Sequence, residues 1–114
     1  MTAPSPLREE ELLRFCGDHV SDLLSMEVLA FWGRHPKCRF TIDAITCAMD
    51  AKRRNVERAL NGLLVQEIII TSVHNDTMLY SLTPDEAKRQ PVLELAALGW
   101  HERRAILERL AQKH

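Results

Sequence analysis

One short stretch of this sequence combines the side chains that bind phosphate groups and nucleobase edges. Its four bases, Lys52, Arg53, Arg54 and Arg58, and its one acid, Glu57, give a net charge of +3 in a chain whose formal net charge is -1. Arginine and asparagine match guanine and adenine edges in a major groove, and bases at a helix N-terminus suit phosphate oxygens. Bases at that end also oppose the helix dipole, at about a few tenths of a kcal/mol each, so a role other than helix stability is indicated.

The same stretch has the apolar spacing of an amphipathic helix over residues 52–65. Apolar residues recur at helical intervals, at Val56, Ala59, Leu60, Leu63 and Leu64. At about 100° per residue, Arg54, Arg58 and Asn61 project from the opposite side, with Asn55 on the flank. We therefore expect these polar side chains to face outward together while the apolar stripe is buried.

A second, shorter helix is predicted just upstream of the basic helix. Thr41 is a typical N-cap, and the apolar residues after it have helical spacing, at Ile42, Ala44, Ile45, Ala48 and Met49. Only residues 49–51 remain for the turn, so the two helices must cross at a steep angle. The pair is predicted to be a helix-turn-helix.

Residues 24–83 resemble the winged helix-turn-helix domain of MarR-like and ArsR-like transcription regulators. The resemblance rests on the run FTIDAITCAMDAKRRNVERALNGLLVQEIIITS and the VHNDTMLYSLT that follows it. Three positions depart from the family pattern: Asp50 stands where a turn Gly is common, Lys52 where a capping Ser is common, and Glu67 where a Gly usually leads into the first wing strand. Asp tolerates left-handed backbone conformations, so Asp50 could itself cap the basic helix.

The resemblance implies a fold that is mostly α with a small β-hairpin, in which the winged domain is flanked by an N-terminal helix (residues 1–23) and C-terminal helices (residues 84–114). It implies a sequence-specific DNA-binding transcription regulator. The chain shows no nucleophile elbow, phosphate loop or zinc-protease motif, so we expect no enzymatic activity and no cofactor.

The expected contacts to double-stranded DNA divide by role. Arg54, Asn55 and Arg58 are expected to read bases, and Asn61 lies on the same outward face. Contacts to phosphate are expected from Arg39, Thr41, Lys52 and Arg53. His74, at the tip of the wing, completes the set. The alternative for such a basic run is a solvated helix face without a ligand.

The wing is predicted from two β-prone segments, residues 68–70 and residues 78–82, with turn formers between them. In the family the tip of this hairpin reaches the minor groove or the phosphate backbone. Here the tip, from His74 to Thr77, contains no Arg or Lys. We therefore expect only a modest contribution from it.

The remaining helices are predicted from their caps and breakers. Ser5 and Pro6 begin an N-terminal helix that ends or bends at Gly17 and Asp18, and Ser25 caps a densely apolar second helix that Pro36 stops. Further on, residues 83–86 (Thr83, Pro84, Asp85 and Glu86) form a cap with Pro84 at the first helical position of a short helix, and Pro91 separates this helix from the apolar segment that follows. Gly99 terminates that segment, and Trp100 opens a final amphipathic helix. A small winged domain cannot cover all this apolar surface, so we expect a two-fold homodimer built on the terminal helices.

The composition fits one domain, with 46% hydrophobic residues in 114. No apolar run approaches the roughly 20 residues that span a bilayer, and the N-terminus lacks the order of a signal peptide, so we expect the protein in the cytoplasm and away from membranes. Three cysteines without a C-x-x-C pair indicate reduced thiols.

Two further kinds of site are suggested by individual residues. Cys16 with His19, and His35 with Cys38, form a possible zinc set, although ordinary thiols and surface histidines explain them better. Trp32 and Trp100 could line a small-molecule effector pocket, but large aromatics at helical spacing are usually core; we expect core packing for Trp32 and interface packing for Trp100.

A second class of function is open at this point, namely a winged-helix protein-interaction module that does not bind DNA. The near-neutral total charge and the uncharged wing tip favour the module, whereas the outward Arg and Asn cluster favours the regulator. A salt titration of binding to duplex DNA distinguishes the two, because only phosphate neutralisation gives a steep negative slope.

Overall fold

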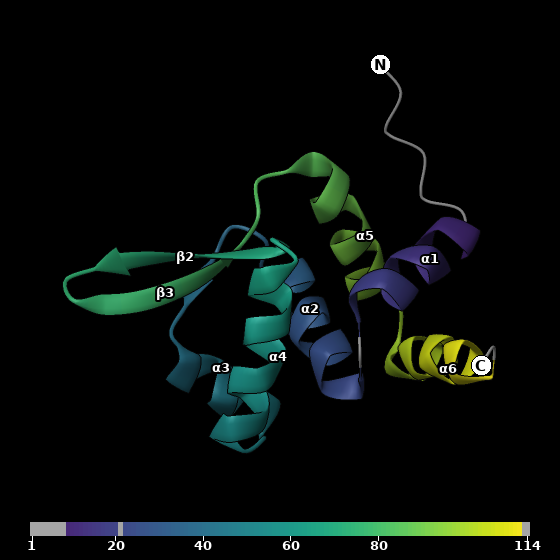
Figure 1. Ribbon diagram of the computed structural model, residues 1–114, viewed down its shortest axis with the longest axis horizontal. Helices are drawn as coiled ribbons and strands as arrows, with labels where there is room; N and C mark the ends of the chain where they lie inside the picture. The colour runs from purple at the N-terminus through teal and green to yellow at the C-terminus, as the bar shows by residue number, and fades with distance from the viewer. Residues whose placement is uncertain (1–8, 21, 113–114) are drawn as a thin grey trace.

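The computed structural model describes residues 9–20 and 22–112. This part of the chain folds into helices and strands in the order α1 (Glu9–His19), α2 (Leu23–Arg34), β1 (Arg39–Phe40), α3 (Ile42–Met49), α4 (Arg53–Val65), β2 (Ile69–His74), β3 (Thr77–Leu82), α5 (Glu86–Ala97) and α6 (Trp100–Ala111). The β2–β3 hairpin projects from one side of the helical body (Figure 1). The fold is a winged helix-turn-helix with flanking helices, as predicted.

Helix α2 forms the centre of the core. Its residues Met26, Val28, Leu29 and Trp32 have no exposed surface, so Trp32 is a core residue as expected. The helix begins at Leu23 because the Asp22 carboxylate accepts a hydrogen bond from the Ser25 N–H at 2.8 Å. Predicting Ser25 as the cap was therefore wrong; an acid three residues upstream caps the helix instead. The C-terminal end at Arg34, two residues before Pro36, agrees with the prediction.

Gly33 lets α2 and α5 approach closely. A Cβ added there would lie 2.5 Å from Ala96 Cβ and 2.6 Å from the Val92 carbonyl oxygen, distances that no side chain tolerates. The sequence carried no sign of this contact. It brings the buried Val92 and Leu95 of α5 against the core helix.

The helix-turn-helix is defined by its caps. Thr41 Oγ1 accepts the Ala44 N–H at 3.1 Å, which confirms Thr41 as the N-cap of α3. Asp50 is left-handed (φ 50°) and closes α3, with its N–H donating to Cys47 and the Ala51 N–H to Thr46. The expectation that Asp50 could cap the basic helix was wrong: Lys52 is that N-cap, without a side-chain hydrogen bond, and α4 starts at Arg53.

Helix α3 is less buried than its apolar pattern suggested. Of the residues with apolar spacing, Ile45 is fully buried, whereas Ala44 and Ala48 are exposed. The helix is only eight residues long and contacts the body mainly through α4 and α2. One face of the helix, with Asp43, Ala44, Cys47 and Ala48, therefore remains exposed.

Glu67 occupies a position that favours glycine. Its backbone is left-handed (φ 58°), and the Glu67 and Ile68 N–H groups donate to the Leu64 and Leu63 carbonyls, which closes α4. The carboxylate lies 3.7 Å from Lys88 Nζ of α5. The family's usual Gly at this point is thus replaced by a residue in the same backbone conformation.

The wing is a regular antiparallel hairpin in a sheet of order β1-β3-β2. Asn75 and Asp76 both have positive φ (51° and 64°), which gives a two-residue loop matched to the twist of the strands. His74 pairs with Thr77, and Arg39 of β1 pairs with Ser81. The predicted hairpin is present, and β1, just before α3, joins it as a third strand.

The flanking helices differ from the predictions at several ends. Helix α1 continues through Gly17 to His19, and its predicted start at Ser5 and Pro6 lies outside the described residues. Helix α5 is capped by Asp85, whose carboxylate accepts the Ala87 N–H at 3.1 Å, rather than by Thr83 and Pro84.

Pro91 was predicted to divide α5, and this was wrong because the helix runs from Glu86 to Ala97 through it. Proline costs the helix one backbone hydrogen bond, which burial of Val92 and Leu95 on the next turn offsets. Gly99 does follow the end of α5, but its φ of -76° is ordinary and it serves as the N-cap of α6.

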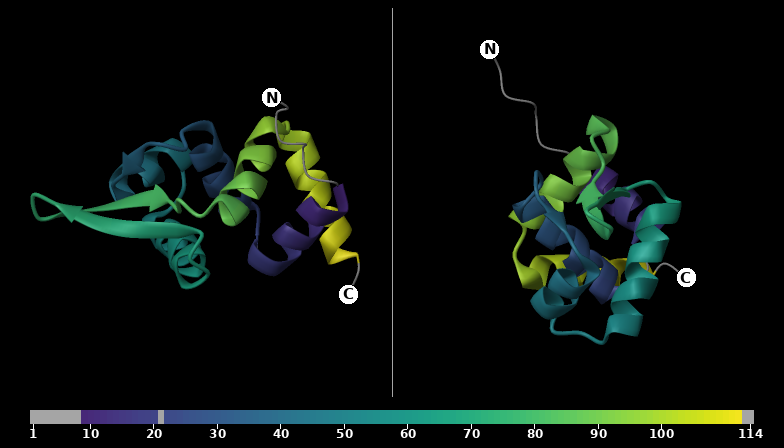
Figure 2. Two further views of the ribbon diagram at one scale, coloured as in Figure 1. Left: turned by 90° about the horizontal axis from the view of Figure 1, so that it is seen from above. Right: turned by 90° about the vertical axis from the view of Figure 1, so that its left-hand side faces the viewer.

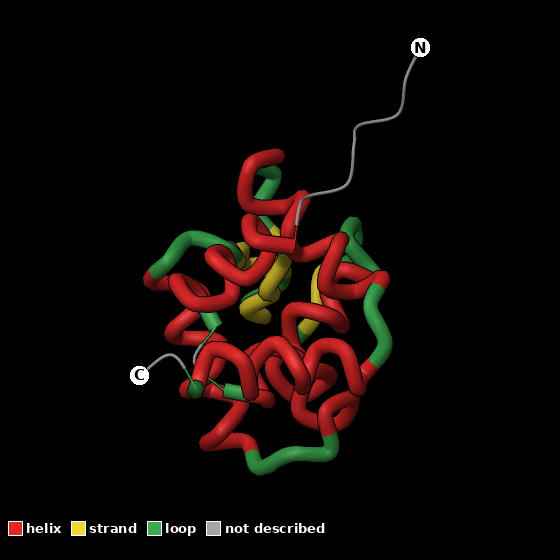
Figure 3. Tube along the Cα trace, turned by 90° about the vertical axis from the view of Figure 1, so that its right-hand side faces the viewer, coloured by secondary structure: helices red, strands yellow, loops and turns green. Residues whose placement is uncertain are grey.

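Helices α1, α5 and α6 lie at the end of the molecule away from the hairpin (Figure 2, left). Viewed from this side, the helices lie around the sheet, and its strands are visible between them (Figure 3). Within the described ranges, no helix is both long enough and apolar enough to cross a membrane.

Candidate nucleic-acid interface

The outer face of α4 presents the predicted polar cluster. Arg54, Arg58 and Asn61 are exposed, while Val56 and Leu60 on the opposite side are almost fully buried. Throughout residues 9–20 and 22–112, neither Arg54 nor Arg58 takes part in an ion pair. Two guanidinium groups on one helix face are therefore available to an anionic ligand.

Arg53, in contrast, is engaged within the chain. Its Nη1 pairs with the Asp43 carboxylate of α3, and its Nε lies 3.2 Å from Glu57 Oε1. All three side chains are at least half exposed, and such pairs stabilise by about 0–1 kcal/mol, so phosphate could compete for this guanidinium. The contacts tie the start of α4 to α3.

The remaining predicted residues lie around α4 rather than on one face. Lys52 is exposed at the helix N-terminus, where no side chain caps the backbone N–H groups, and Asn55 is half-buried on the flank. Thr41 uses its oxygen to cap α3, which leaves its hydroxyl proton free to donate. Arg39 is exposed on β1.

The ninth predicted residue, His74, is separated from this cluster. It lies at the far end of β2, where the hairpin is most distant from the helical body (Figure 1). The wing residues 69–82 include no Lys or Arg. The structure therefore places a cationic helix beside a cation-free hairpin.

A groove between α3, α4 and the wing connects these two parts. It is lined by Ile42, Arg53, Glu57, Asn61, Met78 and Tyr80. Val65, which is 83% exposed, lies on the same side of α4 as Arg58 by helical spacing. Sequence reasoning missed both the groove and this apolar surface position, since the groove exists only after the hairpin folds back toward α4.

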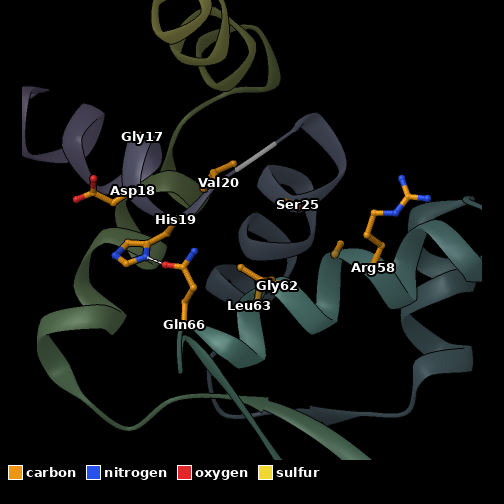
Figure 4. Close-up of a pocket in the computed structure, with 10 residues that line it drawn as sticks. Gly17, Asp18, His19, Val20, Ser25, Arg58, Gly62, Leu63 and Gln66 are labelled. Atoms are coloured by element: carbon orange, nitrogen blue, oxygen red, sulfur yellow. Dashed lines mark hydrogen bonds between the residues drawn. The ribbon is translucent and has the colours of Figure 1, made fainter.

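A second hollow, of about 220 Å³, lies between the end of α1 and α4 (Figure 4). The His19 Nδ1 and the Gln66 side-chain oxygen form a hydrogen bond across it, and Arg58 points away from that pair. Its volume is below the roughly 300 Å³ typical of the smallest ligand pockets. We assign no ligand to this hollow.

The possible zinc set is not assembled. The described ranges hold no group of three or more His, Cys, Asp or Glu residues placed to bind a metal. Cys16 is buried, and burial raises the pKa of its thiol to about 12, whereas a metal ligand must be a thiolate.

Trp100 is 41% exposed at the start of α6, with the Arg104 guanidinium 5.2 Å from the ring centroid. Its exposed ring leaves a flat apolar surface at the start of α6. The apolar residues Ile106, Leu107 and Leu110 of α6 are each half-buried against the core.

Comparison with protein-family models gave no match, and comparison with curated proteins gave no significant match. Solved structures do match over most of the chain. A double mutant of ZitR from Lactococcus lactis is 21% identical, with 97% of this chain and 70% of that chain covered and a TM-score of 0.60. A MarR-family transcriptional regulator from Silicibacter pomeroyi is 22% identical over 90% of this chain and 66% of its own, with a TM-score of 0.59.

A third match is a point mutant of MepR from Staphylococcus aureus, solved bound to an oligodeoxyribonucleotide. It is 14% identical over 92% of this chain and 86% of that chain, with a TM-score of 0.59. At these identities the likeness defines the fold. The chain has the winged helix-turn-helix fold of MarR-family transcription regulators, as the sequence resemblance predicted.

Proposed function

We propose that this protein is a DNA-binding transcription regulator that places α4 in a major groove and acts by occupying its site, without catalysis. The observation that carries the proposal is the pair of exposed guanidinium groups, Arg54 and Arg58, which have no carboxylate partner in the described residues. The fold likeness to MepR, which was solved with an oligodeoxyribonucleotide, supports the same ligand.

The proposed contacts follow from where each side chain lies. Arg54, Arg58 and Asn61 reach base edges from the outer face of α4, and Asn55 contributes from its flank. Lys52 holds phosphate at the open N-terminus of α4, where backbone N–H groups also attract anions. Arg39, Thr41 and, in competition with Asp43, Arg53 add phosphate contacts, while His74 offers the only contact from the tip of the wing.

The proposal includes a homodimer formed through α1 and the C-terminal helices. A symmetric dimer would present two α4 helices to half-sites about 34 Å apart, one turn of DNA. A groove between α1, α5 and α6 is lined by both apolar and charged side chains, among them Leu12, Leu98, Ile106 and Arg109. Light scattering at micromolar concentration should give twice the mass of the chain; a monomer would refute this part.

We also propose that the protein acts in the cytoplasm, because a regulator must share a compartment with its operator. A small-molecule effector is compatible with this role but no pocket of the described residues identifies one. The DNA-binding role itself does not depend on an effector.

The proposal is tested by measuring binding to a random-sequence duplex over a range of salt concentrations. Each phosphate neutralised should steepen the slope of log K against log salt by about 0.9, so the wild type should show a negative slope of several units. Arg54→Ala/Arg58→Ala should flatten it, whereas Arg104→Ala on α6 should not. A flat response of the wild type would reject DNA binding and favour the protein-interaction module.

A further inference from the structure

Arg103 of α6 is a buried cation that the proposed DNA contacts do not use. Its side chain is 6% exposed, and its Nε and Nη2 donate to the two carboxylate oxygens of Glu27 on α2, at 2.6 and 3.0 Å. Two parallel hydrogen bonds between planar groups fix the angle as well as the distance between them. The contact therefore sets the orientation of α6 against α2.

The same guanidinium also binds the end of α5. Its Nη1 donates to the carbonyl oxygens of Leu98 and Leu95, the latter at 3.4 Å. One side chain thus joins α6 to α2 and to the C-terminal turn of α5. Among the described residues, every other ion pair includes a carboxylate side chain that is at least half exposed, so this pair differs from all of them.

Stability alone does not explain this ion pair, in which the Arg103 side chain is buried and the Glu27 side chain is 22% exposed. Removing two charges from water costs about several kcal/mol in general, and apolar residues of similar volume in the same place often give an equally stable protein. What an apolar contact lacks is direction, since hydrophobic packing allows neighbouring orientations of similar energy. A bidentate pair excludes them.

The position of α6 matters for the two DNA-reading helices. α2, which carries Glu27, packs directly on α4, and α6 lies at the side of the molecule away from the wing (Figure 1). If α6 holds the partner subunit, its angle against α2 determines where the two α4 helices stand relative to each other. A change in the angle between α6 and α2 occurs in both protomers of a two-fold dimer, so its effect on the separation of the two α4 helices is doubled.

We propose that Glu27 and Arg103 are positioning residues that set the spacing between the two half-sites that this protein accepts. The proposal rests on the proposed function, since it assumes DNA binding by a dimer. It assigns the spacing to a contact inside each chain, away from both the DNA and the partner. Neither residue is among the proposed DNA contacts.

The first test measures the α6 angle without DNA. One spin label is attached to the exposed Cys47 of α3 and a second to a cysteine introduced at the exposed Ala105 of α6 (Ala105→Cys), while Cys38→Ser removes the other exposed thiol. Pulsed electron paramagnetic resonance then measures the distance between the two labels. Labelled protein is diluted into unlabelled protein so that only distances within one chain are observed. With Glu27 and Arg103 intact, the distribution of label-to-label distances should be narrow. In Glu27→Met/Arg103→Met it should be broad. The matched control is Arg104→Met/Glu108→Met, which removes an exposed ion pair from the same helix at the same net charge.

Equal widths in the two double variants would overturn the proposal. Glu27→Gln is a second variant, which keeps one acceptor and the buried volume, and it should broaden the distribution to an intermediate width. Circular dichroism should be used to check that each variant is folded. This measurement distinguishes failure of the positioning role from failure of DNA binding.

The second test uses a duplex selected by the wild type from a random library, then lengthened by one or two base pairs between its half-sites. Each inserted pair rotates one half-site by about 34°, so the wild type and the control should lose on the order of tenfold or more in affinity. Glu27→Met/Arg103→Met should bind all the duplexes with affinities within about threefold of one another, because its α6 helices can reorient to fit a changed spacing. The strain energy that this reorientation avoids would otherwise cost a factor of ten in affinity for each 1.4 kcal/mol. A wild-type spacing preference in this variant would overturn the proposal, and a wild type that selects no sequence would overturn it together with the proposed function.

Discussion

Helix α4 and the β2–β3 wing are neighbouring surfaces of opposite character. Residues 52–58 carry four bases and one acid, whereas residues 69–82 carry no Lys or Arg and one acid, Asp76. The wing instead exposes an apolar cross-strand pair, Val73 and Met78, which are 70% and 51% exposed. The two surfaces meet in a groove lined by Asn61 and Met78.

This difference assigns two contributions to DNA binding to two separate surfaces: the neutralisation of phosphate charge and the van der Waals contact with the duplex. Affinity for any duplex requires cations that neutralise phosphate. In the proposed complex, α4 and its surroundings supply them. The wing can add van der Waals contact and shape, which depend weakly on salt. The helix should therefore determine both the sequence preference and the salt dependence.

The largest expected effect is at the outer face of α4. Arg54→Ala and Arg58→Ala should each cost about 1 to 3 kcal/mol on the selected duplex and relax the preference at the contacted base pair. Fluorescence anisotropy with matched and mismatched duplexes measures both quantities. Arg104→Ala is the control, and full affinity in both α4 variants would remove these residues from the interface.

Lys52→Ala should have a smaller effect of a different kind. A phosphate contact carries no sequence information, so binding should weaken alike on selected and random duplexes and the salt slope should become shallower by about 1. Titrations at several salt concentrations measure it. A loss confined to the selected duplex would show instead that Lys52 reads a base.

Adding a cation to the wing tests whether the hairpin approaches DNA at all. Thr77 pairs with His74 next to the loop, and Thr77→Arg should steepen the salt slope by up to about 0.9 if phosphate is within reach. Gln112→Arg, at the far end of α6, adds the same charge elsewhere. Identical slopes for the two variants would show that the wing lies away from the duplex.

The smallest effect is expected from the apolar pair on the wing. Val73→Thr and Met78→Gln replace exposed side chains by polar ones of similar size, so stability and affinity should change by no more than about 0.5 kcal/mol, at an unchanged salt slope. Thermal unfolding and the same anisotropy assay check this. A loss comparable to that of Arg54→Ala would mean that the wing supplies a specific apolar contact, and the contrast between the two surfaces would fail.

Predictions from the sequence succeeded where a residue's surroundings are local. The cap at Thr41, the hairpin loop at Asn75 and Asp76, and the buried stripe of α4 depend on neighbours a few residues away. The errors at Ser25 and Pro84 are local as well, because Asp22 and Asp85, within three residues of them, supply the caps instead. The error at Pro91 has another cause, which is packing. Burial of Val92 and Leu95 keeps α5 continuous although Pro91 alone indicates a break.

The candidate site shows the same division. The sequence alone determined which α4 residues face outward, because helical spacing determines the direction of every side chain relative to the apolar stripe. Only the tertiary structure decided which of those cations are free, because Asp43, which pairs with Arg53, lies ten residues before it and on another helix. The Glu27–Arg103 pair, outside the candidate site, likewise joins residues 76 positions apart. Partners so far apart meet because helices pack, and no pattern of spacing along one element records that.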